Sequence, residues 1–205
     1  INNAKNCDGD ILIVHSKKDE EKFVEDGYGS QRKGLMYNDF VIIGPSSDPL
    51  NLKNSETLRD IVTKIYNGSG KFISRGDDSG THKAELKMWK RFNFNPDNFT
   101  KKEFYYETGQ GMGSTLNITI GLDAYSFTDR ATWINFKNKA NHVILFEKDA
   151  FLRNEYGIVM INVNKCKDIN FNLAKTFFNW MVSVEAKELI NKYKIKGQQL
   201  FYTRN

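Results

Sequence analysis

The sequence predicts an α/β fold with mostly parallel sheets, because short apolar runs alternate with amphipathic stretches along its 205 residues. The runs at 9–15, 36–44 and 157–163 are each centred on at least four consecutive apolar residues, which is typical of strands buried on both faces. Residues 55–66 and 170–182 carry apolar side chains at helical spacing. In such folds the crossover connections bring ligand-binding groups to the carboxyl ends of the strands.

Shorter segments complete the expected order of elements. Several of them adjoin Gly, Pro, Asn, Asp or Ser, the residues that favour turns. Further strands are expected at residues 71–74, 104–106, 124–128 and 142–146, and further helices at residues 19–25, 81–92, 114–122, 132–136 and 183–193.

Composition excludes several classes of protein. With 40% apolar and 13% aromatic residues the chain can bury a core, and no run approaches the roughly 18 apolar residues of a membrane span. Residues 1–6 lack the apolar centre of a signal peptide, so we expect that a leader, if the protein is exported, has been removed. The net charge of +5 comes from scattered residues without a basic block, which argues against a nucleic-acid partner.

The cysteines and histidines predict no metal site. Cys7 and Cys166 belong to no C-x-x-C pair, and His15, His82 and His142 lie far apart in the sequence. The two cysteines are compatible with one disulfide or with two free thiols, and the sequence leaves both open.

The most informative segment is 74–82, Ser-Arg-Gly-Asp-Asp-Ser-Gly-Thr-His, which follows an expected strand and opens an expected helix. The first N–H groups of a helix lack internal partners and lie at the positive end of its dipole, so they favour an anion. Ser79 and Thr81 add hydroxyl donors, and Gly80 permits close approach of the backbone. Arg75 supplies a planar fork of donors, and Asp77 can orient it. The alternative is an ordinary capped helix start, since Asp-Ser-Gly-Thr also favours capping.

A second Gly-rich turn, at residues 108–115, precedes another expected helix. The amides of Gly111, Met112 and Gly113 can serve as further donors to an anion. The turn lacks the third glycine of a dinucleotide-binding fingerprint, and residues 68–72 lack both the first glycine and the Ser or Thr of a phosphate loop. No Gly-x-Ser-x-Gly elbow is present either, so the sequence indicates a binding protein and not an enzyme.

Several motifs resemble one known family. The segment from Arg75 to Thr81 resembles the anion loop of periplasmic phosphate-binding proteins. Gly27-Tyr-Gly with Arg32, residues 36–45, 108–117 and 125–133 are more similar to the tungstate-binding proteins of bacterial ABC importers. The match covers nearly the whole chain, and the combination is more specific than the anion loop alone.

The resemblance implies a two-lobed α/β fold of the periplasmic-binding-protein type II class, with a ligand cleft between the lobes. Lobe one would comprise residues 1–44 and 157–205, and lobe two residues 45–156. The family begins with a strand and a Thr/Ser-rich turn that binds the anion. This chain begins within what resembles a later helix, so we expect the first strand-helix unit of lobe one, and its ligands, to be missing.

The resemblance also implies the function. The protein would capture tungstate, without a cofactor, and deliver it to the membrane permease of an ABC importer; it would be monomeric when complete, and periplasmic or extracytoplasmic. Arg75, Ser79, Gly80, Thr81, Gly111, Met112 and Gly113 would bind the anion, with Asp77 and Asp129 supporting them from behind. The alternatives are a phosphate- or molybdate-binding protein of the same fold, or an oxyanion-sensing domain of a regulator.

Overall fold

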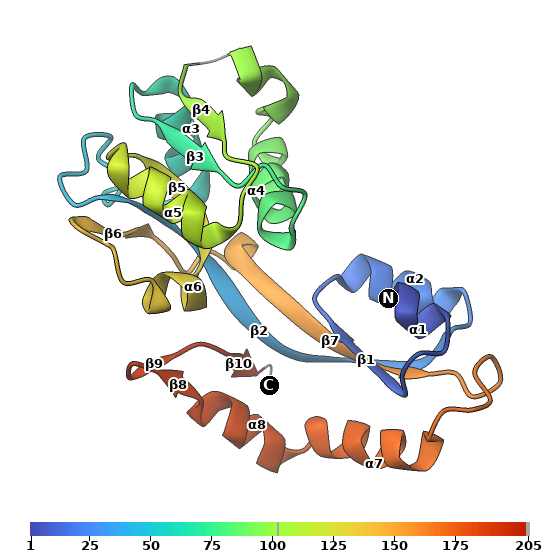
Figure 1. The fold of residues 1–205 in the computed structure, drawn as a ribbon. Helices are drawn as coiled ribbons and strands as arrows, with labels where there is room; N and C mark the ends of the chain where they lie inside the picture. The colour runs from blue at the N-terminus through green and yellow to red at the C-terminus, as the bar shows by residue number, and fades with distance from the viewer. Residues whose placement is uncertain (102, 204–205) are drawn as a thin grey trace. The chain divides into compact units, whose positions relative to one another are not determined.

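The computed structural model describes residues 1–101 and 103–203, and the chain divides into two compact units (Figure 1). Unit 1 comprises Ile1–Asn38 and Asn154–Asn205, and unit 2 comprises Asp39–Arg153. The division therefore falls within strand β2 (Gly29–Pro45) and at the start of strand β7 (Arg153–Ile161). The lobe boundaries expected from the sequence, after residue 44 and before residue 157, lie in the same two strands.

The remaining elements follow the expected alternation of strands and helices. Unit 1 also contains α1 (Asn2–Lys5), β1 (Ile11–Val14), α2 (Lys17–Glu25), α7 (Phe171–Met181), α8 (Val184–Lys192), β8 (Lys194–Ile195), β9 (Gln198–Gln199) and β10 (Tyr202–Thr203). Unit 2 also contains α3 (Leu58–Asn67), β3 (Phe72–Ser74), α4 (Gly80–Arg91), η1 (Pro96–Lys101), β4 (Tyr105–Glu107), α5 (Met112–Gly121), β5 (Tyr125–Asp129), α6 (Arg130–Asn135), β6 (His142–Phe146) and η2 (Ala150–Leu152). None of the helices in the described part of the chain is both long and apolar enough to span a membrane.

The sheet of unit 2 is mixed, which corrects the expectation of mostly parallel sheets. Strand β3 is parallel to both of its neighbours, β4 and β5. Strand β2 runs antiparallel to β5 and to β6. The sequence could not show this difference, because a strand buried on both faces is continuously apolar whichever way its neighbours run.

In unit 1 the strand at 9–15 is present as β1, but the prediction that it is a parallel strand is wrong. It pairs antiparallel with β7, with Ile11 opposite Met160 and Val14 opposite Gly157. Strand β10 also pairs antiparallel, with β2. The two-residue strands β8, β9 and β10 are too short to give a pattern that a sequence reader could detect.

The core of unit 2 lies on both faces of its sheet. Alternate residues of β2 point to opposite faces, as the pleat requires. Phe40 and Ile42 join a cluster with α3, α4 and η1, whereas Val41 and Ile43 join a cluster with α5 and α6. Helices α3 and α4 therefore cover one face of the sheet, and α5 and α6 cover the other (Figure 1). This packing fixes the position at which each helix begins relative to the ends of the strands.

Unit 1 has a smaller core built in the same way around β7. Val159 and Ile161 pack with α1 and α2, and Ile158 and Met160 pack with α7. Inside this unit the fully buried carboxylate of Glu20 is paired with Arg32, with 2.6 Å between Oε2 and Nη2. Gly157 lies against that carboxylate so closely that a Cβ on it would overlap Glu20 Oε2.

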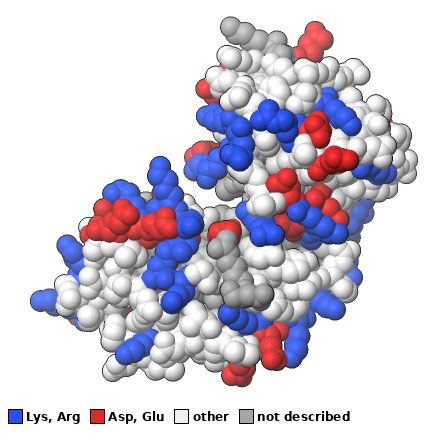
Figure 2. Space-filling view, turned by 180° about the vertical axis from the view of Figure 1, so that it is seen from behind, with Lys and Arg blue, Asp and Glu red and all other residues white. Residues whose placement is uncertain are grey.

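Charged side chains of both signs are mixed on one face of the molecule (Figure 2). On the face shown in Figure 2, Lys and Arg are interspersed with Asp and Glu. A nucleic-acid-binding face is typically dominated by one sign of charge.

Cys7 and Cys166 form a disulfide, which decides between the two alternatives that the sequence left open. The bond joins the end of α1 to the segment that follows β7, across 159 residues of sequence. Its Cys166 end is buried in the unit 1 core beside Phe23 and Val159. Disulfides persist in oxidising compartments, so this pairing supports a location outside the cytoplasm.

Replacing Cys7 by Ser is expected to lower the free energy of unfolding of unit 1 by about 3 kcal/mol, because a long loop is released in the unfolded chain. Urea unfolding monitored by circular dichroism measures the change. Dithiothreitol should destabilise the wild-type protein by a similar amount and leave the Cys7→Ser variant unchanged. Equal effects of dithiothreitol on both proteins would show that the disulfide contributes nothing.

Candidate functional site

Two loops leave the carboxyl ends of two adjacent parallel strands in unit 2. Strand β3 leads through residues 75–79 into α4, and β4 leads through residues 108–111 into α5. The register places Ser74 opposite Glu107, so the two strands end level with each other. Both loops, and the amino ends of both helices, therefore lie at the same edge of the sheet (Figure 1).

Thr108 bonds the two loops together. Its N–H donates to the carbonyl of Ser74 at 3.0 Å, and its hydroxyl donates to the carbonyl of Arg75 at 3.2 Å. The same hydroxyl lies 2.9 Å from that of Thr115 in α5. Gly76 has a φ of +59°, and a Cβ there would lie 2.6 Å from the Cβ of Glu107, so only glycine fits this contact. The two candidate donor segments are held as one piece of structure.

Arg75 lies in the loop between β3 and α4, and some of its N–H donors have no hydrogen-bond partner among the described residues. Its Nη2 is paired with Asp77, and its side chain is 19% exposed. Its Nε is buried without a hydrogen-bond partner, and no described residue accepts from Nη1. A buried donor without a partner is costly, so the geometry favours an acceptor that the protein itself does not supply.

Asp77 orients Arg75, as the sequence predicted it could. One of its oxygens is paired with Arg75, and the other accepts the N–H of Ser79 at 3.3 Å. Burial opposes ionisation of this carboxyl, but hydrogen bonds from Ser79 and Arg75 outweigh it and lower the pKa of Asp77. The carboxylate is therefore ionised and already occupied at neutral pH.

The amino end of α4 is both capped and available to a ligand. Ser79 Oγ accepts the N–H of His82 at 3.3 Å, so the capping alternative considered from the sequence is correct for this hydroxyl. The N–H groups of Gly80 and Thr81 donate to no described residue. His82 adds a further link, since its Nδ1 accepts the N–H of Asp78 and its Nε2 lies 3.5 Å from Glu107.

The amino end of α5 is open. Gly111 is its N-cap, without a side-chain cap, and a Cβ on Gly111 or Gly113 would meet no atom within 4 Å. The side chain of Met112 is buried against Val41 and Leu116, so this residue can offer a ligand only its amide. The glycines leave the first turn of the helix uncovered.

The next parallel strand, β5, ends in charged residues that are already paired. Asp129 accepts the N–H of Thr132 at 2.8 Å and so caps α6; its expected role behind the anion stays a prediction. Arg130 makes two hydrogen bonds to Asp39, at 2.8 and 2.6 Å, and pairs with Glu147 at 2.6 Å. The hydrogen bonds that Arg130 donates to Asp39, together with its interaction with Glu147, raise the pKa of Arg130. Because two carboxylates neutralise it, Arg130 supplies no free charge.

Sequence reasoning missed Glu85, which lies in α4 behind the anion loop. Its fully buried carboxylate accepts hydrogen bonds from Ser74 Oγ at 2.6 Å, Tyr105 OH at 2.8 Å and Trp89 Nε1 at 3.1 Å. Burial raises the pKa of Glu85 to about 7, against the effect of these three donors. The only signal in the sequence was one acidic residue among the apolar positions of this helix.

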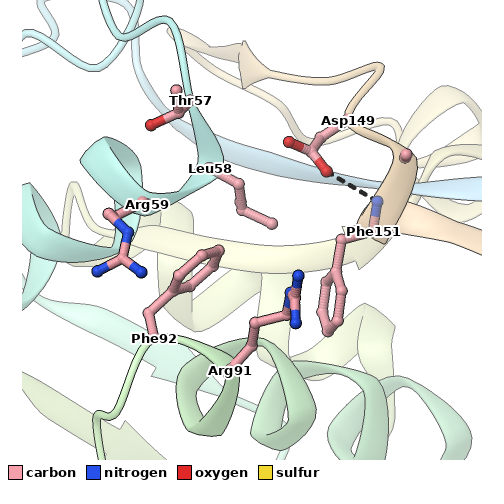
Figure 3. Close-up of a pocket in the computed structure, with 8 residues that line it drawn as sticks. Thr57, Leu58, Arg59, Arg91, Phe92, Asp149 and Phe151 are labelled. Atoms are coloured by element: carbon pink, nitrogen blue, oxygen red, sulfur yellow. Dashed lines mark hydrogen bonds between the residues drawn. The ribbon is translucent and has the colours of Figure 1, made fainter.

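A pocket of unit 2 lies away from this edge of the sheet. Its volume is about 590 Å³, and its lining includes Arg59, Arg91, Phe92, Asp149 and Phe151 (Figure 3). It lies at the carboxyl end of α4, opposite the anion loop, and both guanidinium groups are stacked on phenylalanine rings.

Comparisons with known proteins identify the family. Residues 1–185 match the family model described as PBP superfamily domain. The protein named tungstate-binding protein TupA of Peptoclostridium acidaminophilum is 43% identical over 193 residues, which are 93% of this chain and 66% of that protein. The protein of the same name from Campylobacter jejuni is 35% identical over 202 residues, 97% of this chain and 74% of that protein. The solved structure of the tungstate-binding protein TupA from Desulfovibrio alaskensis G20 superposes with a TM-score of 0.92 at 39% identity, covering 99% of this chain and 82% of that one.

The chain therefore belongs to the PBP superfamily, the periplasmic-binding-protein class, and within it to the family of the proteins named tungstate-binding protein TupA. This confirms the resemblance read from the motifs and the α/β fold class that it implied. The chain spans just under two thirds, 66%, of the length of the Peptoclostridium acidaminophilum relative.

The raised pKa of Glu85 predicts how stability varies with pH. A carboxyl that titrates near 7 when folded, against an ordinary value of 4.5, binds its proton more tightly in the folded state. The stabilisation is complete below pH 4.5 and is lost as the pH rises to about 7, an expected loss of about 3 kcal/mol.

Urea unfolding at pH 5 and pH 8 tests this expectation, with Glu85→Gln as the comparison. The glutamine side chain has the same shape but no charge, so the difference in stability between wild type and variant should change by about 3 kcal/mol between the two pH values. A constant difference would show that Glu85 is ionised throughout this range.

Proposed function

We propose that this protein is an extracytoplasmic solute-binding protein that captures tungstate and delivers it to the permease of an ABC importer. The observation that carries the proposal is Arg75, which presents unpaired donors at the edge where α4 and α5 begin. Relatives at 43% and 35% identity bear the name tungstate-binding protein, which supports this choice of ligand.

The donors at this edge suit a tetrahedral dianion. Arg75 offers its Nε and Nη1, and the first turns of α4 and α5 offer the amides of Gly80, Thr81, Met112 and Gly113. A hydrogen bond to a charged group contributes about 1.5–3 kcal/mol, so these six donors give on the order of 10 kcal/mol before the costs of binding. A nanomolar affinity needs about 12 kcal/mol net, which is more than these donors leave after the costs of binding are subtracted.

The carboxylate of Asp77 helps to choose between oxyanions. Phosphate carries a proton near neutral pH and requires an acceptor for it, whereas tungstate and molybdate carry none. Both oxygens of Asp77 are occupied, by Arg75 and by the N–H of Ser79. The site therefore fits a fully deprotonated oxyanion better than phosphate, and molybdate is the second candidate ligand.

The same features support a binding role and an extracytoplasmic location. The donors at this edge hold an anion but include no group arranged to attack it, so we propose no catalysis. The disulfide favours an oxidising compartment, and membrane association would come through the permease. We expect the protein to be monomeric and to bind no nucleic acid.

Calorimetry with tungstate, molybdate, phosphate and sulfate tests the proposal. We expect tungstate and molybdate to bind, and phosphate, which carries a proton, to bind at least tenfold more weakly. Sulfate is fully deprotonated but smaller than tungstate, and we expect it also to bind at least tenfold more weakly because of its size. Preferential binding of phosphate, or no binding of any of the four, would overturn the assignment.

Replacing Arg75 by Ala should weaken tungstate binding by about 2 kcal/mol or more, roughly 30-fold, because the anion loses its one charged partner in this loop. The matched control is Arg59→Ala, which removes an arginine from the pocket at the far end of α4 and should leave affinity unchanged. Equal affinities of the two variants for tungstate would show that Arg75 does not bind the anion.

Replacing Gly113 by Val should reduce tungstate affinity at least tenfold, since the side chain would cover the open first turn of α5. Gly121→Val at the other end of the same helix is the control, because a Cβ at either glycine meets no atom within 4 Å. Both variants should melt at similar temperatures. If the two bind equally well, the amino end of α5 is not part of the site.

A further inference from the structure

Glu85 connects the elements from which both anion-binding loops depart. Its hydrogen bonds reach Ser74, the last residue of β3, and Tyr105, the first residue of β4, while the glutamate itself belongs to α4. Ser74 in turn accepts the N–H of Thr108, the residue that bonds the two loops together. The carboxylate of Glu85 is thus hydrogen-bonded to Ser74, the residue that directly precedes Arg75 in the chain.

We propose that Glu85 is a positioning residue of the oxyanion site and that binding of the oxyanion draws a proton onto its carboxylate. The inference rests on the proposed function. It adds that the protein takes up a proton when it binds the oxyanion. Glu85 does not touch the anion; it acts through Ser74, through Tyr105 and through the field along α4.

The direction of the coupling follows from charge. An anion at the start of α4 lies five residues before Glu85, a rise of about 7.5 Å along the helix. Two negative groups at this separation in a poorly solvated site repel each other. The bound state therefore favours the neutral carboxylic acid, and a carboxyl that titrates at about pH 7 in the free protein can take up the proton near neutral pH.

The neutral acid also fits the surrounding donors. Oε1 can continue to accept from Tyr105 and Trp89, while a proton on Oε2 can be donated to Ser74 Oγ, since a hydroxyl both donates and accepts. Protonation therefore reverses one hydrogen bond and breaks none. The positions of β3, β4 and α4 are kept in both states of Glu85.

Other ionisable groups near Glu85 must be separated from it in any test. Tyr105 bonds to it directly and has a raised pKa, because of burial and then of Glu85 itself, so its hydroxyl stays protonated. Glu107 on β4 adds repulsion, and His82, one turn earlier on α4, lies 3.5 Å from Glu107. Arg75 is paired with Asp77 in the same loop.

Calorimetric titration with tungstate between pH 6.5 and pH 8.5 tests the proposal. We expect wild-type affinity to fall at least about fivefold over this range, since a single linked proton changes affinity by up to about tenfold per pH unit. At pH 7 the binding enthalpy should differ between Pipes and Tris in the sense of proton uptake. In Glu85→Gln both effects should disappear, and its affinity at pH 8.5 should be tighter than that of wild type.

Two further variants separate the coupling from a structural effect. Tyr105→Phe removes one donor to the ionised carboxylate, so it should raise the pH midpoint of the affinity profile, which damage to the fold would not do. His82→Gln removes the neighbouring histidine and should keep the pH dependence. If the dependence is lost in His82→Gln and kept in Glu85→Gln, histidine is the titrating group and the proposal is wrong.

The ligand-free protein gives an independent measurement. The ¹³C resonance of the Glu85 carboxyl should titrate near pH 7, and titration near pH 4.5 would overturn the coupling even if tungstate binds tightly. If the carboxyl titrates near pH 7 but the wild-type protein binds none of the four oxyanions, the proposed function has failed, and the coupling fails with it.

Discussion

The parallel pairing of β3 with β4 is the constraint on which the rest of the candidate site depends. Because Ser74 lies opposite Glu107, both strands end at one level and both following helices begin there. Thr108 then uses its N–H and its hydroxyl to tie the second loop to the backbone of the first. Without this register the two sets of helix amides would face different regions of solvent, and neither alone would replace the water shell of a dianion.

The two arginines at this edge of the sheet are both paired with carboxylates, but to different extents. Arg130 is fully engaged by Asp39 and Glu147, and it links the ends of β5 and β6 to the middle of β2. Among the described residues, Arg75 is engaged by Asp77 alone and keeps donors without partners. Both arginines directly follow the end of a parallel strand. Arg130 has a structural role because its charge is fully paired, whereas Arg75 is a candidate ligand because it keeps unpaired donors.

Unit 1 is stabilised differently from unit 2, because its hydrophobic core is small. Strand β7 is buried on both faces, but the clusters on either side contain few residues, and the disulfide between Cys7 and Cys166 constrains α1 against this core. The buried pair of Glu20 and Arg32 is compatible with this arrangement only because residue 157 is glycine. A unit of this kind depends on covalent and ionic contacts more than unit 2 does.

The sequence by itself determined the local structure and the place of the candidate site. Apolar periodicity located the principal strands and helices, and the segment from Arg75 to Thr81 indicated an anion loop, since helix starts and glycine-rich turns are encoded by adjacent residues. Only the tertiary structure decided that β1 runs antiparallel to β7 and that the two cysteines pair. Only the tertiary structure showed that Met112 turns its side chain into the core and that Glu85 is buried behind the loop. Periodicity reports how deeply a segment is buried, but strand direction, disulfide partners and the donors around a buried carboxylate depend on residues far apart in the sequence, which meet only when the chain has folded.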